Sequence, residues 1–272
     1  MSEQQQGQDS EFARSMALRQ IDEWVWEGDF SAGWCIGQVP NGGYTLAFGA
    51  KVLAAALPHH DPLNVNAYYL ARSEPGPVRC EVELLRVGKS TSNGMVKLIQ
   101  NGEVKIQLIG VFQDIDKLSG VTQVREGIPD MPSYEQCVDM PHAPNLKLRD
   151  RLIQRLAADN IQALTEGPNG EPTWRGWQAL KDGSDIDLFA VLMFCDALPP
   201  PAFAIYGAKG RVPTIEMSVQ VHRRPCPGPL RCEFKTRFIT AGVVNEDGMI
   251  WDSEDNLVAL CRQTAKLRVA PS

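Results

Sequence analysis

One heptapeptide occurs twice in this chain in nearly the same form. Pro75–Glu81 reads PGPVRCE and Pro227–Glu233 reads PGPLRCE, so six of seven residues agree at an offset of 152 in a chain of 272 residues. A repeat at this distance indicates two equivalent halves if the surrounding sequence repeats the same pattern. The order of apolar and polar residues around each copy therefore decides which fold the chain can adopt.

Each copy starts a segment in which apolar and polar residues alternate. A period of two is typical of a β-strand with one buried face, and Pro-Gly-Pro before it is typical of a turn. One strand-like segment precedes each copy, two follow it, and Arg72 and Arg224 match at the fixed offset. The apolar positions expected on the buried faces are Val78, Cys80, Val82 and Leu84 in the first half, and Leu230, Cys232, Phe234 and Phe238 in the second.

Each half also contains an apolar helix candidate ahead of these strands. Residues 44–57 and 187–198 contain few charges, and each segment is followed by proline. A helix that is apolar on nearly every face must be covered by other elements. Each half is therefore expected to wrap an antiparallel sheet around one helix, which predicts an α+β fold of two tandem units.

The expected organisation has four parts. A polar N-terminal segment covers residues 1–19, a first helix-and-sheet domain covers 20–116, a linker covers 117–170, and a second domain covers 171–272. The linker is rich in proline and aspartate, and residues 146–164 could form a short helix within it.

Composition excludes several classes of function. The net charge is −6 and no basic stripe occurs, so nucleic acid is not an expected partner. No run of 18 apolar residues predicts a membrane span, and the polar start of the chain lacks a signal peptide, so we expect a cytoplasmic protein. The seven cysteines form no CxxC pair, so neither a disulfide framework nor a metal site nor a cofactor is expected.

Specific motifs link this pattern to a known family. The first half contains Arg-x-Gly-x-Ser, Gln-Asn-Gly and a closing Phe-Gln, and PNGGYTLA precedes the helix candidate. These motifs resemble those of the acyl-CoA thioesterase II (TesB-like) family, whose fold is the double hotdog. The matching residues are Arg86, Gly88, Ser90, Gln100, Asn101, Gly102, Phe112 and Gln113. The resemblance implies hydrolysis of acyl-CoA to free acid and CoA by a water molecule that Asp196, Thr214 and Gln263 hold.

The residues themselves give independent reasons to examine this trio. Gln263 is the one amide in the apolar row of the last predicted strand, from Leu257 to Val269, and an unpaired buried amide costs about 1–3 kcal/mol. Asp196 closes the apolar run 188–195 near a helix end, where burial should raise its pKa and make it a better general base. Thr214 starts the next strand and could help Gln263 to orient the water.

Each residue also has a structural interpretation that the sequence leaves open. Gln263 could bond to backbone or turn outward at a bulge, Asp196 could lie in a solvated loop, and Thr214 could be an ordinary strand residue. The Gly42 and Gly43 pair at the helix start could donate a backbone N–H to an oxyanion, with Gly43 as the expected donor, or could only permit a tight turn.

The repeat predicts one catalytic centre per chain. At the corresponding positions of the first half, Pro62, Gly110 and Ala55 replace Thr214, Gln263 and Asp196. The first half is therefore expected to act as a structural partner and as acyl or CoA surface. Candidate ligands for the CoA phosphates are Arg72, Arg86 and Lys89.

Two other functions remain open, and the assembly is a further expectation. The chain could bind acyl-CoA without catalysis, or it could be a hotdog hydratase or dehydratase, which usually needs a histidine paired with an acid. None of the four histidines, His59, His60, His142 and His222, lies in a sequence context suited to that role. We expect a homo-oligomer, since outer sheet faces could pair.

Overall fold

The computed structural model describes residues 10–208 and 210–269. Residues 1–9 of the expected N-terminal segment and residues 270–272 of the expected second domain lie outside the described residues. Residues 10–19 include the short helix α2 (Glu11–Arg14), and Phe12 and Met16 are buried in the core. The N-terminal segment therefore packs against the first half over the part that is described.

The first half wraps an antiparallel sheet around the helix α3 (Gly42–Ala56). Asn41 caps this helix, because its side chain accepts the N–H of Tyr44, and the chain turns extended at Leu57 before Pro58. Phe48, Leu53 and most other residues of α3 are buried. The strands of this half are β1 (Leu18–Asp22), β2 (Val25–Phe30), β5 (Asp61–Tyr69), β6 (Gly76–Val87), β7 (Thr91–Gln100) and β8 (Glu103–Gln113).

The second half repeats this arrangement with a shorter helix. Helix α5 spans Leu188–Phe194, and Asp187 caps it by accepting the N–H of Ala190. The strands of this half are β9 (Val138–Asp139), β10 (Leu152–Leu156), β11 (Thr173–Leu180), β13 (Thr214–Val221), β14 (Leu230–Thr240), β15 (Val243–Trp251) and β16 (Leu257–Lys266). Short elements complete the fold: η2 (Ala32–Trp34), β3 (Cys35–Ile36), β4 (Val39–Pro40), η3 (Ile115–Lys117), η4 (Lys147–Arg151), α4 (Ala158–Thr165), α6 (Phe203–Tyr206), β12 (Gly210–Arg211) and β17 (Arg268–Val269).

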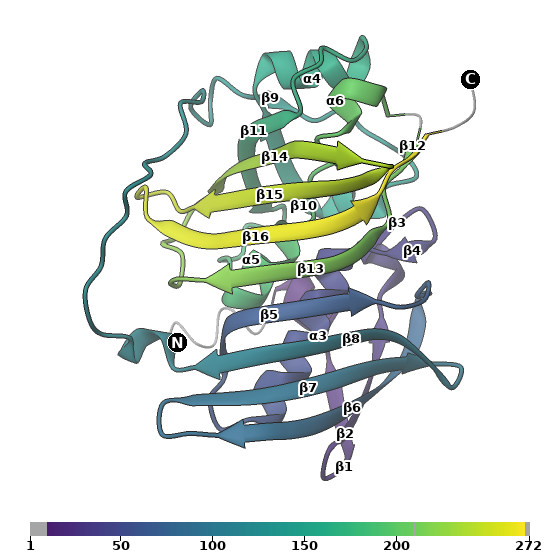
Figure 1. Ribbon diagram of the computed structural model, residues 1–272, viewed down its shortest axis with the longest axis vertical. Coiled ribbons are helices and arrows are strands. Elements are labelled where there is room, and N and C mark those ends of the chain that lie inside the picture. The colour runs from purple at the N-terminus through teal and green to yellow at the C-terminus, as the bar shows by residue number, and fades with distance from the viewer. Residues whose placement is uncertain (1–9, 209, 270–272) are drawn as a thin grey trace.

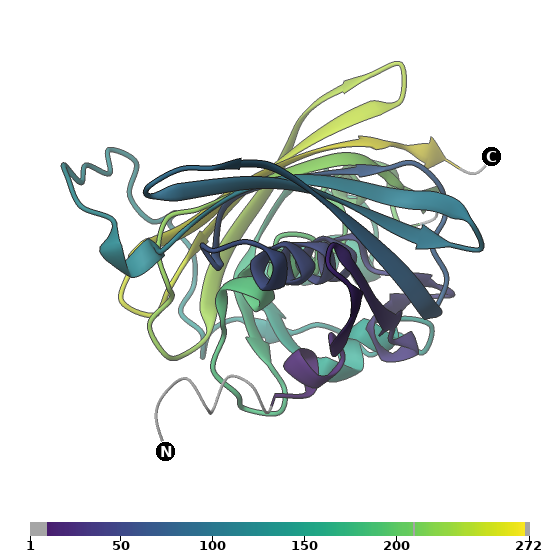
Figure 2. The same cartoon turned by 90° about the horizontal axis from the view of Figure 1, so that it is seen from below.

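The two halves form one continuous sheet. Strand β5 pairs with β13, and within the described residues 13 strands follow the order β1-β2-β6-β7-β8-β5-β13-β16-β15-β14-β11-β10-β9 (Figure 1). The sheet arches over one layer that contains α3 and α5, which pack against each other (Figure 2). The predicted α+β architecture of two tandem helix-and-sheet units is therefore present.

The alternation predicted for the repeated strands is present as far as a β-bulge that occurs at the same place in both halves. Cys80 and Cys232 are both fully buried at equivalent positions. Leu84 and Phe238, however, were expected on the buried faces and are 39% and 66% exposed. A β-bulge follows Leu84 in β6 and Thr236 in β14. An extra residue at a bulge changes the face that later side chains occupy, which accounts for Phe238; Leu84 precedes its bulge, so the bulge does not account for its exposure. Leu84 and Thr236 differ by the repeat offset, so the bulge is itself part of the repeat.

The segment expected to be a linker contributes to the second half. Strands β9 and β10 extend the sheet beyond β11, and residues 126–137 pass over its outer face. Trp177 on β11 donates its indole N–H to the carbonyl of Pro132 at 3.1 Å, and Tyr134 packs edge-on against the same ring. A cavity of about 430 Å³ lies beneath residues 126–130. This segment therefore covers a face of the sheet as well as joining the two halves.

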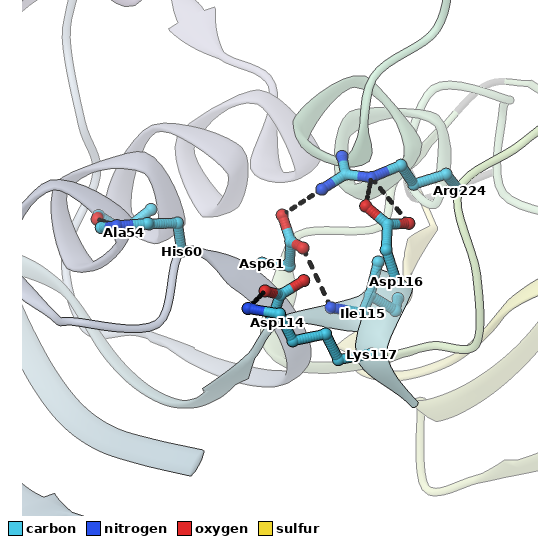
Figure 3. A network of polar contacts seen from close by, with 8 residues as sticks. All are labelled: Ala54, His60, Asp61, Asp114, Ile115, Asp116, Lys117 and Arg224. Carbon is cyan, nitrogen blue, oxygen red and sulfur yellow. Dashed lines mark hydrogen bonds and ion pairs between the residues drawn. The ribbon is translucent and has the colours of Figure 1, made fainter. Parts of the chain in front are cut away.

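An ion-pair network connects the halves on the side away from the candidate site. Arg224, which follows β13, binds Asp61 Oδ1 of β5 at 2.6 Å and Asp116 Oδ2 at 3.0 Å (Figure 3). Lys117 binds Asp114 at 2.5 Å. The carboxylates of Asp61, Asp114 and Asp116 lie within 4.8 Å of one another, and the two cations each bind members of this cluster, so we interpret it as a structural clasp.

Candidate active site

Asp196 lies in the turn that follows α5, where the two helices meet. The helix was predicted to contain Asp196 but ends at Phe194, and Cys195 is its C-cap. The Asp196 N–H still donates to the carbonyl of Met193 at 3.1 Å, which keeps the turn helical in character. Asp196 is half-buried rather than solvated. The open alternative of a solvated loop residue is therefore not what the structure shows.

The first half supplies two donors to the Asp196 carboxylate. The Gly43 N–H donates to Oδ2 at 3.0 Å, and Asn41 Nδ2 donates to the same oxygen at 3.0 Å and to the Asp196 carbonyl at 2.8 Å. Asn41 and Gly43 belong to the first turn of α3, where unpaired N–H groups and the positive end of the helix dipole favour an anion. The carboxylate thus lies at the C-terminus of one helix and at the N-terminus of the other.

The two glycines are required by the close approach of the halves. A Cβ atom on Gly43 would lie 2.5 Å from the Met193 carbonyl oxygen, and one on Gly42 would lie 2.8 Å from Asp196 Oδ2. Neither contact is tolerable for real atoms, and the first is with rigid backbone. The glycine pair therefore permits close contact between the start of α3 and the end of α5. The sequence predicts only a tight turn as the structural reason for these glycines.

Gln263 and Thr214 reach the same carboxylate from the sheet. Gln263 lies in β16 on the helix-facing side, 7% exposed, and its Nε2 donates to Asp196 Oδ1 at 3.3 Å. The Thr214 hydroxyl at the start of β13 donates to Gln263 Oε1 at 2.8 Å. The structure therefore brings together all three residues of the predicted trio in one chain of hydrogen bonds.

Burial raises the pKa of Asp196 from 3.8 to about 6. Loss of hydration is the largest cause, because it disfavours the charged form. The hydrogen bonds from Gly43, Gln263 and Asn41 act in the opposite direction and stabilise the carboxylate. The balance leaves a group that is mostly ionised at neutral pH yet basic enough to accept a proton, as a general base requires.

Four consecutive backbone carbonyls at the end of α5 each receive a side-chain donor. A helix end leaves such carbonyls without partners inside the helix. Here the donors come from four different elements, and these bonds hold the turn that carries Asp196. The pairs are Gln178 Nε2 to Phe194 O at 3.2 Å, Cys261 Sγ to Cys195 O at 3.8 Å, Asn41 Nδ2 to Asp196 O at 2.8 Å, and Gln154 Nε2 to Ala197 O at 2.8 Å.

Three residues near the carboxylate were not anticipated from sequence. Asn41 was seen only as part of a glycine-containing helix start. The Tyr69 hydroxyl at the end of β5 donates to the Gly42 carbonyl at 2.8 Å, and burial and the nearby Asp196 charge raise its pKa well above the usual range. Glu246 lies opposite Gln263 on β15 and is 6% exposed. Its strand was expected to begin at Gly248, which hid the alternation of Val244, Glu246, Gly248 and Ile250.

The first half has no equivalent of the polar trio. Gln263 lies opposite Met217 on β13, and Gly110 lies opposite Val65 on β5, so the strand register relates Gln263 to Gly110. The space above Gly110 is filled by Phe112 and Leu53. Pro62 replaces Thr214 by the repeat offset, and Ala55 is exposed.

The basic residues considered for the CoA phosphates differ in position. Arg86 and Lys89 are exposed at the β6–β7 hairpin. Thr91 at this hairpin pairs with Gln113 of β8, and Gln113 pairs with Asp61 of β5, so the hairpin lies at the Asp61 end of the sheet. Asp61 starts β5, whereas the site lies at the other end of that strand, near Tyr69. Arg72, also exposed, follows Tyr69 by three residues and is at the end that carries the site.

The histidines lie away from the Asp196 carboxylate and have other partners or exposed positions. His59 Nδ1 is 2.7 Å from Ser92 Oγ, and His60 Nδ1 is 2.7 Å from the Ala54 carbonyl oxygen. His142 is exposed and lies 3.8 Å from Asp150, and His222 is also exposed. None forms a histidine and acid pair at the site, as a hotdog hydratase would need.

The fold and the site define a double hotdog protein, and comparisons with known proteins agree. Residues 30–113 match the acyl-CoA thioesterase N-terminal domain, and residues 134–267 match the acyl-CoA thioesterase C-terminal domain. The chain belongs to this acyl-CoA thioesterase family, and the resemblance to thioesterase II proteins is confirmed. The second match begins inside the segment 117–170, in agreement with the strands that this segment contributes.

Solved structures and curated relatives cover nearly the whole chain at low identity. A Thermobifida fusca protein proposed to be a thioesterase II has a TM-score of 0.87 at 23% identity and covers 95% of this chain and 98% of its own. The acyl-CoA thioesterase II TesB2 of Mycobacterium marinum has a TM-score of 0.76 at 16% identity, covering 95% and 98%. The uncharacterised protein Rv0499 of Mycobacterium tuberculosis is 23% identical over 93% of this chain and 97% of its own. These structural likenesses establish the double hotdog fold.

Across the described residues, no helix combines the length and the apolar character that a membrane span requires.

Proposed function

We propose that this chain hydrolyses acyl-CoA thioesters to a free acid and CoA by direct attack of water, with Asp196 as general base. The observation that carries the proposal is the hydrogen-bonded chain from Thr214 through Gln263 to Asp196, which connects two strands and a helix end. Membership of the acyl-CoA thioesterase family supports the reaction class, and this geometry supports the choice of these three residues.

In the proposed reaction, Asp196 accepts a proton from water while the water oxygen bonds to the thioester carbonyl carbon. The resulting tetrahedral oxyanion then collapses, the carbon–sulfur bond breaks, and the thiolate of CoA leaves and takes up a proton. Gln263 and Thr214 orient the water by hydrogen bonds. No GxSxG motif occurs in the sequence, which favours attack by water over an acyl-serine intermediate.

The oxyanion requires a donor, and Gly43 remains our candidate. Its N–H lies at the positive end of α3, where a developing negative charge is favoured. This N–H also donates to Asp196 Oδ2 at 3.0 Å, so a bound thioester oxygen would share it with the carboxylate. Asn41 and Gln263 would still hold Asp196 while the carbonyl oxygen binds at Gly43.

The substrate is expected to be an acyl-CoA, and Arg72 is the basic residue best placed for its phosphates. Arg72 is exposed and lies just beyond the strand end that carries Tyr69. Exposed Arg79, which pairs with Glu81 on β6, provides a matched control. Arg72→Ala should raise KM for acyl-CoA with little change in kcat, whereas Arg79→Ala should change neither.

The direct test is release of free thiol from acyl-CoAs of short, medium and long chain, followed with a thiol reagent. Hydrolysis of any of them supports the proposal. If acyl-CoA binds with micromolar affinity but no thiol appears, the chain is a non-catalytic acyl-CoA binder. If instead an enoyl-CoA is hydrated without release of thiol, the chain is a hydratase.

We further propose that the protein acts in the cytoplasm in fatty acid metabolism and assembles as a homo-oligomer. Tyr68 and Ile109 on the outer face of the central strands are 44% and 38% exposed, and exposed apolar residues on a sheet face favour association. Light scattering after size-exclusion chromatography measures the assembly, and a monomer at all concentrations contradicts it.

A further inference from the structure

Glu246 is a buried carboxyl group beside the proposed site. It lies on the helix-facing side of β15 between Val244 and Gly248, and its register partner on β16 is Gln263. Its side chain is 6% exposed. A carboxyl group is rarely buried in an apolar row unless it has a partner or a function.

The matched row of the first half is apolar. Across β14, β15 and β16, the second half places Thr236, Glu246 and Gln263 opposite one another. The first half places Leu84, Gly94 and Gly110 in the same register. There, Leu53 and Leu57 fill the space above Gly94. The fold therefore needs no polar group at these positions, so fold stability does not account for Glu246.

The hydrogen bonds of Gln263 explain what Glu246 can do. A glutamine side chain offers one acceptor oxygen and two N–H donors. The oxygen accepts the Thr214 hydroxyl at 2.8 Å, and Nε2 donates to Asp196 at 3.3 Å. Glu246 is the register partner of Gln263 on the same side of the sheet, and the Gln263 side chain lowers the pKa of its carboxyl group. The amide thus lies between the carboxyl groups of Asp196 and Glu246, and loss of either one loosens its orientation.

We propose that Glu246 is a positioning residue that holds the Gln263 amide in the orientation needed to direct water at Asp196, and that it does so as a neutral carboxyl group. This inference rests on the proposed thioester hydrolysis. A neutral carboxyl accepts one hydrogen bond and donates another. Thr236, the register partner of Glu246 on β14, has a buried hydroxyl oxygen with no hydrogen-bond partner among the described residues.

The electrostatic surroundings agree with a neutral Glu246. The titratable groups that act on it are Asp196, Cys261 of β16 and Asp247, the next residue, whose side chain lies on the opposite face of the sheet. Burial, the largest cause, and the Asp196 charge together raise the pKa of Glu246 from 4.5 to about 8, while the interaction with Gln263 lowers it. Two carboxyl groups whose pKa values are pushed apart in one site are typical of residues with different roles in catalysis.

Two substitutions separate positioning from simple packing. Glu246→Gln retains a neutral acceptor for Gln263 but cannot ionise, so it should keep kcat near neutral pH and lose the decline in rate above pH 8. Glu246→Leu removes the acceptor yet suits an apolar row, so kcat should fall about tenfold, as for one lost hydrogen bond, with KM unchanged. Glu83→Gln, on the exposed end of β6, is the control and should match the wild type.

The failure of this inference is distinguishable from failure of the proposed function. If the wild type hydrolyses acyl-CoA but Glu246→Leu keeps full kcat, or Glu246→Gln keeps the same alkaline decline, the positioning role is wrong. If no variant and no wild type hydrolyses thioesters, the Gln263 amide resonances in NMR still test the contact. They should shift between pH 7 and 9 in the wild type and not in Glu246→Gln. If the Gln263 amide chemical shifts change neither with pH nor with substitution of Glu246, the inference is wrong.

Discussion

Asn41 donates its side-chain amide to two atoms of Asp196, the carbonyl oxygen at 2.8 Å and Oδ2 at 3.0 Å, across 155 residues of sequence. The same side chain caps α3 by accepting the Tyr44 N–H at 2.9 Å. The first half therefore contributes directly to the candidate site, beyond the structural and surface roles expected for it.

Asn41→Asp should separate these two tasks of Asn41. Aspartate caps helices as well as asparagine does, so α3 should remain intact. The new carboxylate cannot donate to Asp196 and repels it, which should raise the pKa of Asp196. We expect the acid limb of the pH–rate profile to move to higher pH and kcat at pH 7 to fall. Melting temperature and circular dichroism report whether the fold is retained, and an unmoved acid limb contradicts the assignment.

Asp196→Asn should remove the general base. The amide oxygen can still accept the Gly43 N–H, so the turn should persist while proton transfer is lost. We expect kcat to fall by at least about 100-fold, the usual contribution of a positioned base, with acyl-CoA binding retained in calorimetry.

Gln263→Leu should also lower kcat, and a Gln263→Leu variant with full turnover and higher stability would mean that Gln263 is structural only.

The wild-type rate should rise with pH through about 6, because Asp196 must be ionised to accept a proton and burial raises its pKa to about 6. The measurement is kcat/KM from pH 4.5 to 9 with an acyl-CoA that is chemically stable over this range. A rate that already reaches its plateau at pH 4.5 contradicts the role of Asp196 as the base.

Stability should depend on pH in the opposite sense. Folding raises the pKa of Asp196 from 3.8 to about 6 and that of Glu246 from 4.5 to about 8. The folded protein therefore binds these two protons more tightly than the unfolded chain does. Their contribution is present at low pH and is lost as pH rises, between about 4 and 6 for Asp196 and between 4.5 and 8 for Glu246, at about 1.4 kcal/mol for each unit of pKa difference. Urea midpoints should therefore decline less between pH 6 and 9 in Glu246→Gln than in the wild type.

Gly43→Ala should cost both stability and activity. The added Cβ would lie 2.5 Å from the Met193 carbonyl oxygen, so α3 and the end of α5 must move apart and Asp196 must lose its N–H donor. Gly127→Ala is the matched control, since a Cβ there meets no atom within 4 Å. Thermal melts and kcat of the two variants test the difference, and an active Gly43→Ala enzyme with the wild-type melting temperature refutes the close contact.

Arg224→Met should lower stability without lowering activity. Arg224 of the second half binds Asp61 and Asp116 of the first half, but its side chain is 46% exposed. Partly exposed ion pairs contribute about 1 kcal/mol or less, so we expect a small drop in the urea midpoint that shrinks further at high salt. Normal kcat in this variant would show that the clasp is independent of the site, and a large loss of kcat would contradict that separation.

Much of the architecture could be predicted from the sequence because the repeat shows which segments form strands and which form helices in each half. The alternation in residues 78–82 and 230–234 follows directly from one buried sheet face, and the apolar helices must be covered by other elements. The pattern fails at Phe238, since a bulge depends on pairing with the next strand and leaves no mark in the sequence of its own strand. Leu84 precedes its bulge and is nevertheless 39% exposed.

The candidate site was accessible only in part. Gln263 is visible as an amide in an apolar row, and the motif resemblance adds Asp196 and Thr214. Asn41 and Glu246 were missed because their significance depends on long-range contacts. Asn41 reads as an ordinary helix cap, and Glu246 lies in a polar stretch, VNEDG, that hides the start of its strand.

The four side chains that bind the carbonyls of residues 194–197 also bear on how the protein folds. They come from β10, β11, β16 and the start of α3, so this turn is complete only when segments from both ends of the chain have assembled. Contacts this distant in sequence form slowly. Catalytic competence should therefore return in the final kinetic phase of refolding, after most of the secondary structure, and separately expressed halves should be inactive until they associate.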